Sequence, residues 1–114
     1  MRKGDNVYIG HMLDKALLAM DKVRGKTRDE YDTDEDLRMI TAYLVQTIGE
    51  AARRVSQKTR DAHPQIPWKR ITGIRHRIVH DYMDVDYDII WEVVTGRLPV
   101  LVEELKKILS AEEN

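Results

Sequence analysis

Arginine and histidine are concentrated in one short stretch, Gly73–Tyr82, which has the sequence GIRHRIVHDY. Cleaving RNA without a metal ion requires a base that removes the 2′-hydroxyl proton, an acid that protonates the leaving 5′-oxygen, and cations that stabilise the phosphorane. Histidine can serve as the base or the acid near neutral pH, and arginine binds phosphate through two parallel hydrogen bonds. Arg75 and His80 are therefore candidate catalytic residues.

Two other interpretations of this stretch stay open. His76 and His80 are four residues apart, so a helix would present both imidazoles on one face, with Asp84 as a third metal ligand. The glutamate of the H-E-x-x-H pattern is missing, and no fourth ligand is evident. Alternatively, the stretch is only the C-terminal end of a helix, where histidines favour the helix dipole and arginines pair with nearby acids.

The spacing between Arg75 and His80 sets a geometric condition for catalysis. Five residues correspond to roughly 140° around an ideal helix, so the two side chains converge only if the helix loosens before His80 or if a second molecule contributes. One histidine cannot be base and acid in the same event. A two-fold dimer that brings two Arg75/His80 pairs to its axis would supply both.

The formal net charge of −1 hides an uneven distribution of charge. The stretch from Arg53 to Arg77 contains eight Lys or Arg and one acid, Asp61, and so carries +7, while the remaining 11 basic and 19 acidic residues carry −8. A basic stripe on an otherwise acidic protein is a candidate phosphate-binding surface, because local potential rather than net charge attracts polyanions. A solvated helix face is the alternative.

Composition excludes several classes of protein. The chain has 114 residues, a length typical of one domain, and it has no cysteine, which excludes disulfides and thiolate zinc sites. No apolar run approaches the roughly 18 residues of a membrane span, and the N-terminus lacks a signal-peptide stretch, so we expect a cytoplasmic protein without membrane contact. With 6% aromatic residues and no Phe, a base-stacking platform of the RRM kind is not expected.

Apolar spacing predicts an all-α domain, an up-and-down bundle of four to five helices. The expected helices cover residues 6–24, 34–58, 68–80 and 87–109, with an interruption near Arg97 because Gly96 and Pro99 flank it. No strand is expected, and residues 25–32 and 59–67 are expected to be connections.

Local signals place the ends of these helices. Asp5 or Asn6 is the expected N-cap of the first helix, Thr33 with Asp36 resembles a capping box, and Pro67 is suited to the first position of the third helix.

The second expected helix carries an apolar face that is wider than a small bundle needs. Such a face is either core or the seam of a two-fold dimer. Its residues are Tyr43, Leu44, Thr47, Ile48, Ala51 and Ala52, with Gly49 among them.

The sequence resembles the HEPN ribonucleases, in particular the HepT-like toxins of HepT/MntA toxin–antitoxin pairs. The Arg-x4-His-x-Tyr signature of that family matches Arg75, His80 and Tyr82. The likeness extends over roughly residues 5–110 in four ordered blocks. The blocks are YLVQTIGEAA at 43–52, PQIPW at 64–68 with GIR at 73–75, YDIIW at 87–91, and LP at 98–99.

This resemblance implies a single HEPN-like helical domain over residues 1–114, with an ordered core at about 5–110, that forms a homodimer. It implies a metal-independent endoribonuclease without a cofactor, whose composite cleft lies at the subunit interface, and tRNA is a candidate substrate. Carried over by position, Arg75 would bind and polarise the scissile phosphate, and His80 would be the general acid/base.

The resemblance also implies regulation in a type VII toxin–antitoxin system. Tyr82 would accept AMP from ATP through a cognate MntA-like nucleotidyltransferase antitoxin. A bulky anionic adduct two residues from His80 would repel an RNA phosphate. The alternative is that the Tyr82 ring packs against the bundle.

Further residues are expected to support the site. Glu50 is expected to be partly buried and paired with an arginine, Arg75 being the candidate. The family most often has Asn where this chain has His76, which leaves the role of His76 open. The residues expected to contact phosphates are His76, Arg77, Arg70, Lys69, Arg53 and Arg54. The runner-up function is a non-catalytic helical module that binds nucleotides, RNA or a protein partner.

Overall fold

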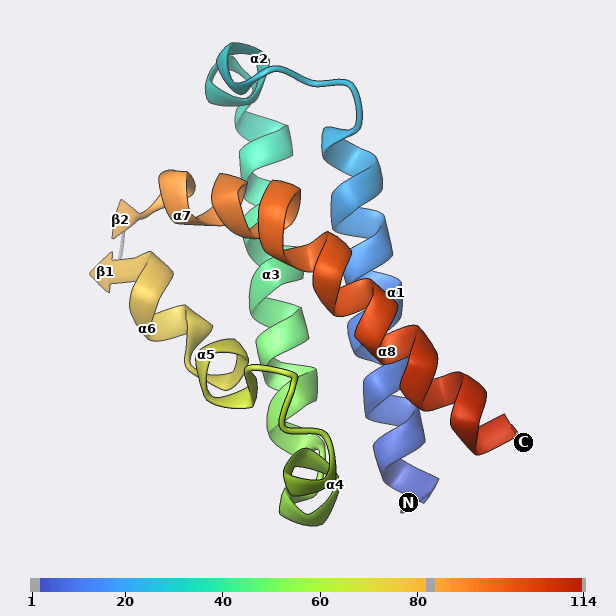
Figure 1. Ribbon diagram of the computed structural model, residues 1–114. Coiled ribbons are helices and arrows are strands. Elements are labelled where there is room, and N and C mark those ends of the chain that lie inside the picture. Colours follow the sequence, from blue (N-terminus) through green and yellow to red (C-terminus); the bar gives the residue numbers. More distant parts are fainter. Residues whose placement is uncertain (1–2, 82–83, 114) are drawn as a thin grey trace.

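The computed structural model describes residues 3–81 and 84–113, and most of them are helical (Figure 1). The expected all-α helical bundle is confirmed, but the chain divides into more and shorter helices than the four or five predicted. The elements are α1 (Lys3–Val23), α2 (Arg28–Thr33), α3 (Glu35–Arg54), α4 (Gln57–Ala62), α5 (Trp68–Thr72), α6 (Ile74–Ile78), β1 (Val79–Asp81), β2 (Asp84–Val85), α7 (Tyr87–Glu92), the π-helix η1 (Val93–Arg97) and α8 (Leu98–Glu113).

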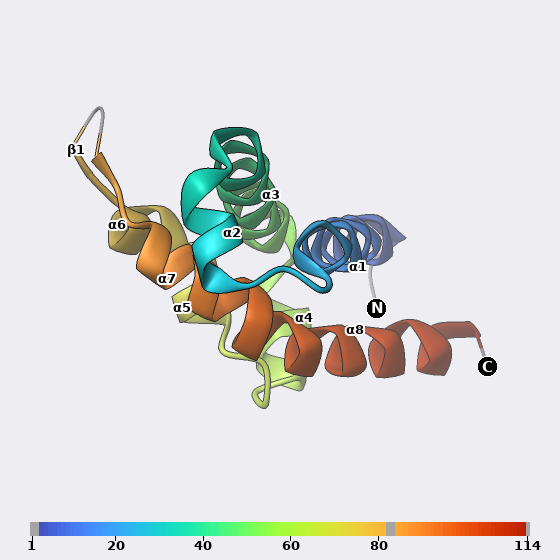
Figure 2. The ribbon, with the colours of Figure 1, turned by 90° about the horizontal axis from the view of Figure 1, so that it is seen from above.

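The long helices form the core. α1 and α3 run side by side in opposite directions, and α8 crosses α1 (Figure 1). Seen from above, α7 and α8 form a layer beneath α1 and α3 (Figure 2). Each of these helices buries one face, and burying one aliphatic side chain contributes about 1.5–3 kcal/mol. The core side chains that are completely or almost completely buried include Ile9, Met12, Leu44, Ile90, Val94 and Leu105.

Asp5 does not cap α1, because α1 begins at Lys3 and Asp5 lies within it. The carboxylate of Asp5 is 2% exposed and accepts hydrogen bonds from the start of α4. The donors are Ser56 N at 2.9 Å, Ser56 Oγ at 2.7 Å and Thr59 Oγ1 at 2.6 Å. These hydrogen bonds hold the start of α4, and the backbone of Val55 just before it is extended, so α3 ends at Arg54. The prediction that this helix continues to residue 58 is therefore wrong.

A short helix, α2, occupies much of the predicted connection at 25–32. Its capping box is formed by Thr27 and Glu30, with hydrogen bonds of 2.9 and 3.1 Å. The capping box predicted at Thr33 and Asp36 is wrong, because the Thr33 hydroxyl donates back to α2 carbonyls and Asp34 caps α3 by accepting from Leu37 N at 3.0 Å.

The predicted helix at 68–80 is split into α5 and α6 at Gly73 and ends at Ile78. Pro67 lies one position before α5 rather than at its first residue. A strand pair that the sequence did not predict follows α6: β1 pairs antiparallel with β2, and Ile78 O accepts from Asp86 N at 2.6 Å. The pair projects from the end of α6 away from α1 and α8 (Figure 2).

The predicted interruption near Arg97 is confirmed in its position. The chain stays helical there but widens into η1, in which the N–H of Leu98 donates to Val93 O, five residues earlier. Pro99, which has no N–H to donate, follows in the first turn of α8. Within the described residues, no helix combines the length and the apolar character needed to cross a bilayer.

Candidate active site

The helix α6 carries Arg75, His76 and Arg77, and all three side chains are exposed. Within the part of the chain that the structure describes, none of them forms a side-chain hydrogen bond or an ion pair. The positive charges of Arg75 and Arg77 are therefore not neutralised by a neighbouring carboxylate there. Lys69 and Arg70 are exposed on the preceding helix, α5, so α5 and α6 present five basic or titratable side chains.

The backbone leaves the helical conformation between Arg75 and His80. α6 ends at Ile78, Val79 is extended with φ −112° and ψ 105°, and His80 lies in β1. The condition that the helix must loosen before His80 is thus met within one chain. The same geometry removes the shared helix face on which the metal interpretation placed His76 and His80. The side chain of His80 and all of Tyr82 lie outside the described residues, and their roles stay predictions.

Glu50 differs from its prediction. Its side chain is 62% exposed rather than partly buried, and its carboxylate lies 3.8 Å from Nη1 of Arg53, one turn along α3. An exposed pair of this kind contributes about 1 kcal/mol or less. The described contacts of Glu50 therefore do not include Arg75.

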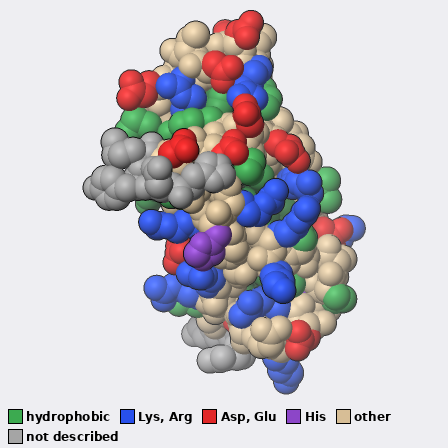
Figure 3. Space-filling model, turned by 90° about the vertical axis from the view of Figure 1, so that its left-hand side faces the viewer, with side chains coloured by type: hydrophobic (Ala, Val, Ile, Leu, Met, Phe, Trp, Pro, Cys, Tyr) green, Lys and Arg blue, Asp and Glu red, His purple; other side chains and the backbone are tan. Residues whose placement is uncertain are grey.

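The six predicted phosphate-binding residues come from three helices, α3, α5 and α6. Arg53 lies beside Glu50, and the guanidinium of Arg54 stacks 5.8 Å from the ring centre of Tyr8 on α1. The other four lie on α5 and α6. Figure 3 views the side of the molecule on which α5 and α6 lie: several Lys and Arg side chains lie beside and below a histidine there, and most of the acidic side chains in view lie in the upper part.

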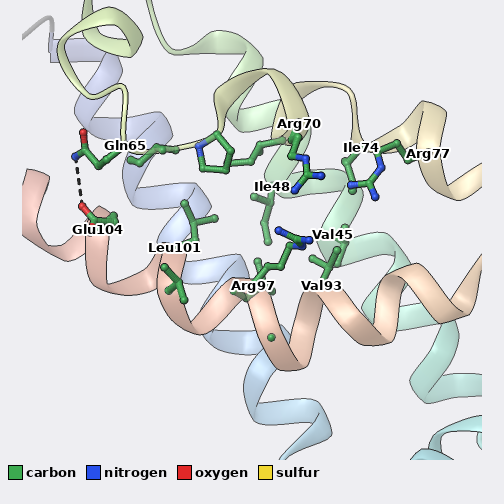
Figure 4. Close-up of a pocket in the computed structure, with 16 residues that line it drawn as sticks. Val45, Ile48, Gln65, Arg70, Ile74, Arg77, Val93, Arg97, Leu101 and Glu104 are labelled. Atoms are coloured by element: carbon green, nitrogen blue, oxygen red, sulfur yellow. Dashed lines mark hydrogen bonds between the residues drawn. The ribbon is translucent and has the colours of Figure 1, made fainter.

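Arg97 is a basic residue near this region that the sequence did not single out. It comes from η1, yet it lines the same groove as Arg70 and Arg77 (Figure 4). The sequence holds no local signal for this proximity, because Arg97 is 20 residues from Arg77 and the contact is tertiary.

Comparison with known proteins gives consistent matches. Residues 12–108 match the family described as "Ribonuclease HepT-like". A protein of Caldanaerobacter subterraneus subsp. tengcongensis named "Putative RNase" is 31% identical over 106 residues, which cover 93% of this chain and 95% of that protein. A protein of Thermococcus cleftensis named "Probable ribonuclease HepT" is 22% identical over 108 residues, 95% of this chain and 98% of that protein.

A longer relative of Methanocaldococcus jannaschii, named "Gamma-glutamylcyclotransferase and putative RNase", is 32% identical over 109 residues. The match covers 96% of this chain but 49% of that protein, so the chain spans about half of this relative. No solved structure matches. Because the family match includes nearly the whole helical bundle and the Arg75–His80 segment, the chain belongs to the HepT-like ribonuclease family.

Proposed function

We propose that the protein is an endoribonuclease toxin that cleaves RNA without a metal ion at a cleft between two copies of the chain. The observation that carries the proposal is the change from helix to strand after Ile78, in a chain of the HepT-like ribonuclease family. This change frees His80 from the helix that holds Arg75. The guanidinium of Arg75 is exposed and has no ion-pair partner among the described residues, so it is suited to bind a phosphate.

In the proposed reaction, His80 of one copy removes the 2′-hydroxyl proton, and the 2′-oxygen attacks the adjacent phosphorus. The bond from phosphorus to the 5′-oxygen breaks, and the second copy's histidine at the same position donates the proton to that oxygen. The products are a 2′,3′-cyclic phosphate and a 5′-hydroxyl. Arg75 stabilises the phosphorane, whose added negative charge strengthens the charge-assisted hydrogen bonds. tRNA is the first substrate to test.

Cleavage of labelled tRNA in the presence of EDTA tests this reaction. We expect wild-type protein to cleave, and Arg75→Ala and His80→Ala each to lower the rate at least about 100-fold, the lower end of acid–base contributions. Arg24→Ala is a matched control, because Arg24 is an exposed arginine at the end of α1 that pairs with Asp21 at 2.9 Å, and it should keep wild-type activity.

Three results would contradict the proposal. Equal cleavage by wild type and both variants would exclude the two residues from catalysis. Loss of cleavage on chelation would indicate a metal-dependent enzyme. RNA binding without cleavage of any RNA would favour the non-catalytic binding module.

We further propose that Tyr82 accepts AMP from ATP through a nucleotidyltransferase antitoxin. The proposal is supported by the position of Tyr82 two residues from His80 and by the repulsion that an added phosphate would exert on RNA. Intact mass after incubation with the partner and ATP should show increments of AMP for wild type and none for Tyr82→Phe. Tyr43→Phe, which alters an exposed tyrosine of α3, should behave as wild type. Increments on Tyr82→Phe would refute the assignment.

A further inference from the structure

An open groove of about 230 Å³ lies between α5–α6 on one side and η1–α8 on the other, with α3 at its floor (Figure 4). The proposed reaction does not account for its apolar lining, which is aliphatic and drawn from each of these elements. Val45 and Ile48 come from α3, Ile74 from α6, Val93 from η1 and Leu101 from α8. Val100 belongs to the lining and is 65% exposed, so it is accessible to a partner.

Positive charge gathers at one end of this apolar floor. The guanidinium groups of Arg70, Arg77 and Arg97 turn toward the same space from three different elements (Figure 4). Among the described residues of the lining, Glu104 is the one that is acidic. It lies at the opposite end, where its carboxylate accepts a hydrogen bond of 3.3 Å from Gln65. Arg97 also pairs at 3.2 Å with Glu92, but both side chains of that pair are about half exposed.

We propose that this groove is the docking site for an acidic amphipathic helix of a partner protein. A cavity of about 150 Å³ lined by similar residues holds one benzene molecule, so the groove has room for roughly nine carbon atoms, or about two leucine side chains. Two leucines at positions i and i+4 of a helix supply such a pair. Carboxylates flanking them on the helix would meet the three arginines.

The lining disfavours two other occupants. RNA could use the three arginines but gains little from a floor of Val, Ile and Leu, because single-stranded bases gain most by stacking on aromatic rings, and the described lining contains no Trp, Tyr or His. A second copy placed groove to groove by a two-fold axis through the arginine end would oppose three arginines with the same three arginines. An acidic partner neutralises them instead. The inference does not depend on ribonuclease activity.

A labelled synthetic helix tests the site. The probe is a fluorescein-labelled peptide of about 18 residues, built from Glu, Ala and Leu, with leucines at i and i+4 and glutamates on both flanks. We expect fluorescence anisotropy to show saturable binding to the wild-type protein. Val100→Asp and Arg97→Glu should each weaken binding at least about tenfold, because each adds negative charge at the groove. Arg24→Glu, on an exposed arginine just beyond the end of α1, should leave binding unchanged.

Companion measurements separate the proposed occupant from the others. A second peptide with Gln in place of Glu should bind at least about tenfold more weakly, which isolates the charge contribution. Circular dichroism confirms that the variants are folded, and light scattering should give wild type and Val100→Asp the same mass.

The proposal is overturned if the peptide does not bind or if Arg24→Glu loses as much affinity as Arg97→Glu. It is also overturned if Val100→Asp dissociates an oligomer, which would make the groove a contact between copies. A matching loss of affinity for an oligouridylate in Val100→Asp would assign the groove to RNA.

Discussion

At the scale of single residues, the buried phenol of Tyr31 shows how burial sets a titration. The Tyr31 side chain is completely buried, its ring lies 4.9 Å from that of Trp91, and its hydroxyl is 2.8 Å from Thr41 Oγ1. Burial raises the pKa of Tyr31, because the phenolate would lose its hydration, and the hydrogen bond with Thr41 opposes this effect only in part. The side chain therefore joins α2 to α3 in its neutral form.

Alkaline pH should therefore destabilise the fold through Tyr31. A tyrosine in the unfolded chain titrates near pH 10, whereas Tyr31 in the folded chain keeps its proton to higher pH. Above about pH 10 the unfolded state binds fewer protons, so the free energy of unfolding falls as pH rises. At pH 7, Tyr31→Phe should lower the free energy of unfolding by about 1 kcal/mol, because the hydrogen bond with Thr41 is lost. Between about pH 8 and 11, urea unfolding should show a smaller fall in the free energy of unfolding for Tyr31→Phe than for wild type.

Tyr43→Phe is the control for this titration, because Tyr43 is 61% exposed. The free energy of unfolding of Tyr43→Phe should depend on pH as that of wild type does. If the free energies of unfolding of Tyr31→Phe and Tyr43→Phe fall equally with pH, Tyr31 is not the group responsible.

The candidate site could be predicted in part at this scale. The types and spacing of Arg75, His76 and Arg77 indicated an exposed basic segment, and the structure exposes all three. The prediction for Glu50 failed, because its sequence neighbours Ile48, Ala51 and Ala52 belong to the buried face of α3 while Glu50 points away from it. Adjacency in a helix does not imply shared burial, since neighbouring residues differ by about 100°.

At the scale of the elements, Gly49 sets how closely α5 and α6 approach α3. A Cβ at this position would lie 2.9 Å from Ile71 O and 2.9 Å from Cγ2 of Ile74. The carbonyl belongs to the backbone of α5 and cannot turn aside. Gly49 thus positions the two helices that carry Arg70 and Arg75.

Gly49→Ala should therefore destabilise the protein. Overpacking costs about 1–3 kcal/mol, which exceeds the gain of up to about 1 kcal/mol in helix propensity. Because α5 and α6 must shift, the rate of RNA cleavage should fall as well. Urea unfolding and the cleavage assay measure the two effects.

Gly10→Ala is the matched control, since Gly10 lies within α1 and a Cβ there meets nothing within 4 Å. It should raise the free energy of unfolding by about 0.5–1 kcal/mol and leave cleavage unchanged. A stabilised Gly49→Ala protein with full activity would contradict the proposed contact.

The helical periods of the sequence predicted where helices lie better than where they end. Residues within α1, α3 and α8 follow the apolar spacing expected for them. The end of α3 depends instead on Asp5, whose side chain reaches Ser56 from 51 residues away. Sequence-local capping rules do not include such a partner.

At the scale of the whole molecule, the structure narrows the surface available for the proposed dimer. Most of the predicted seam is core, because Leu44, Ile48, Ala51 and Ala52 pack inside the chain. The apolar side chains that α3 leaves exposed are Met39 at 58% and Tyr43 at 61%. They lie beside Tyr87 along a shallow depression that also includes Gln46 and Thr47.

Tyr43→Asp should weaken the homodimer if α3 forms its interface. A charge in an apolar interface is left without a partner, so the dissociation constant should rise at least about tenfold in analytical ultracentrifugation. If the cleft is built by two copies, the specific ribonuclease activity of the variant should fall at low protein concentration and recover at high concentration.

Val7→Asp provides the control, because Val7 is a comparably exposed aliphatic residue on α1. It should leave both the mass and the activity unchanged. Dissociation by Val7→Asp with an intact Tyr43→Asp dimer would place the interface on α1 instead.

The sequence by itself determined the helical class, the interruption near Arg97 and the chemistry available at Arg75, because periodicity, proline and side-chain type act over a few neighbouring residues. Only the tertiary structure decided where α6 ends relative to His80, what Asp5 caps and which arginines share a groove. Arg70, Arg77 and Arg97 line one groove because α5, α6 and η1 all pack against α3. Proximity of this kind depends on contacts between segments that are distant in the sequence, and no local sequence pattern encodes it.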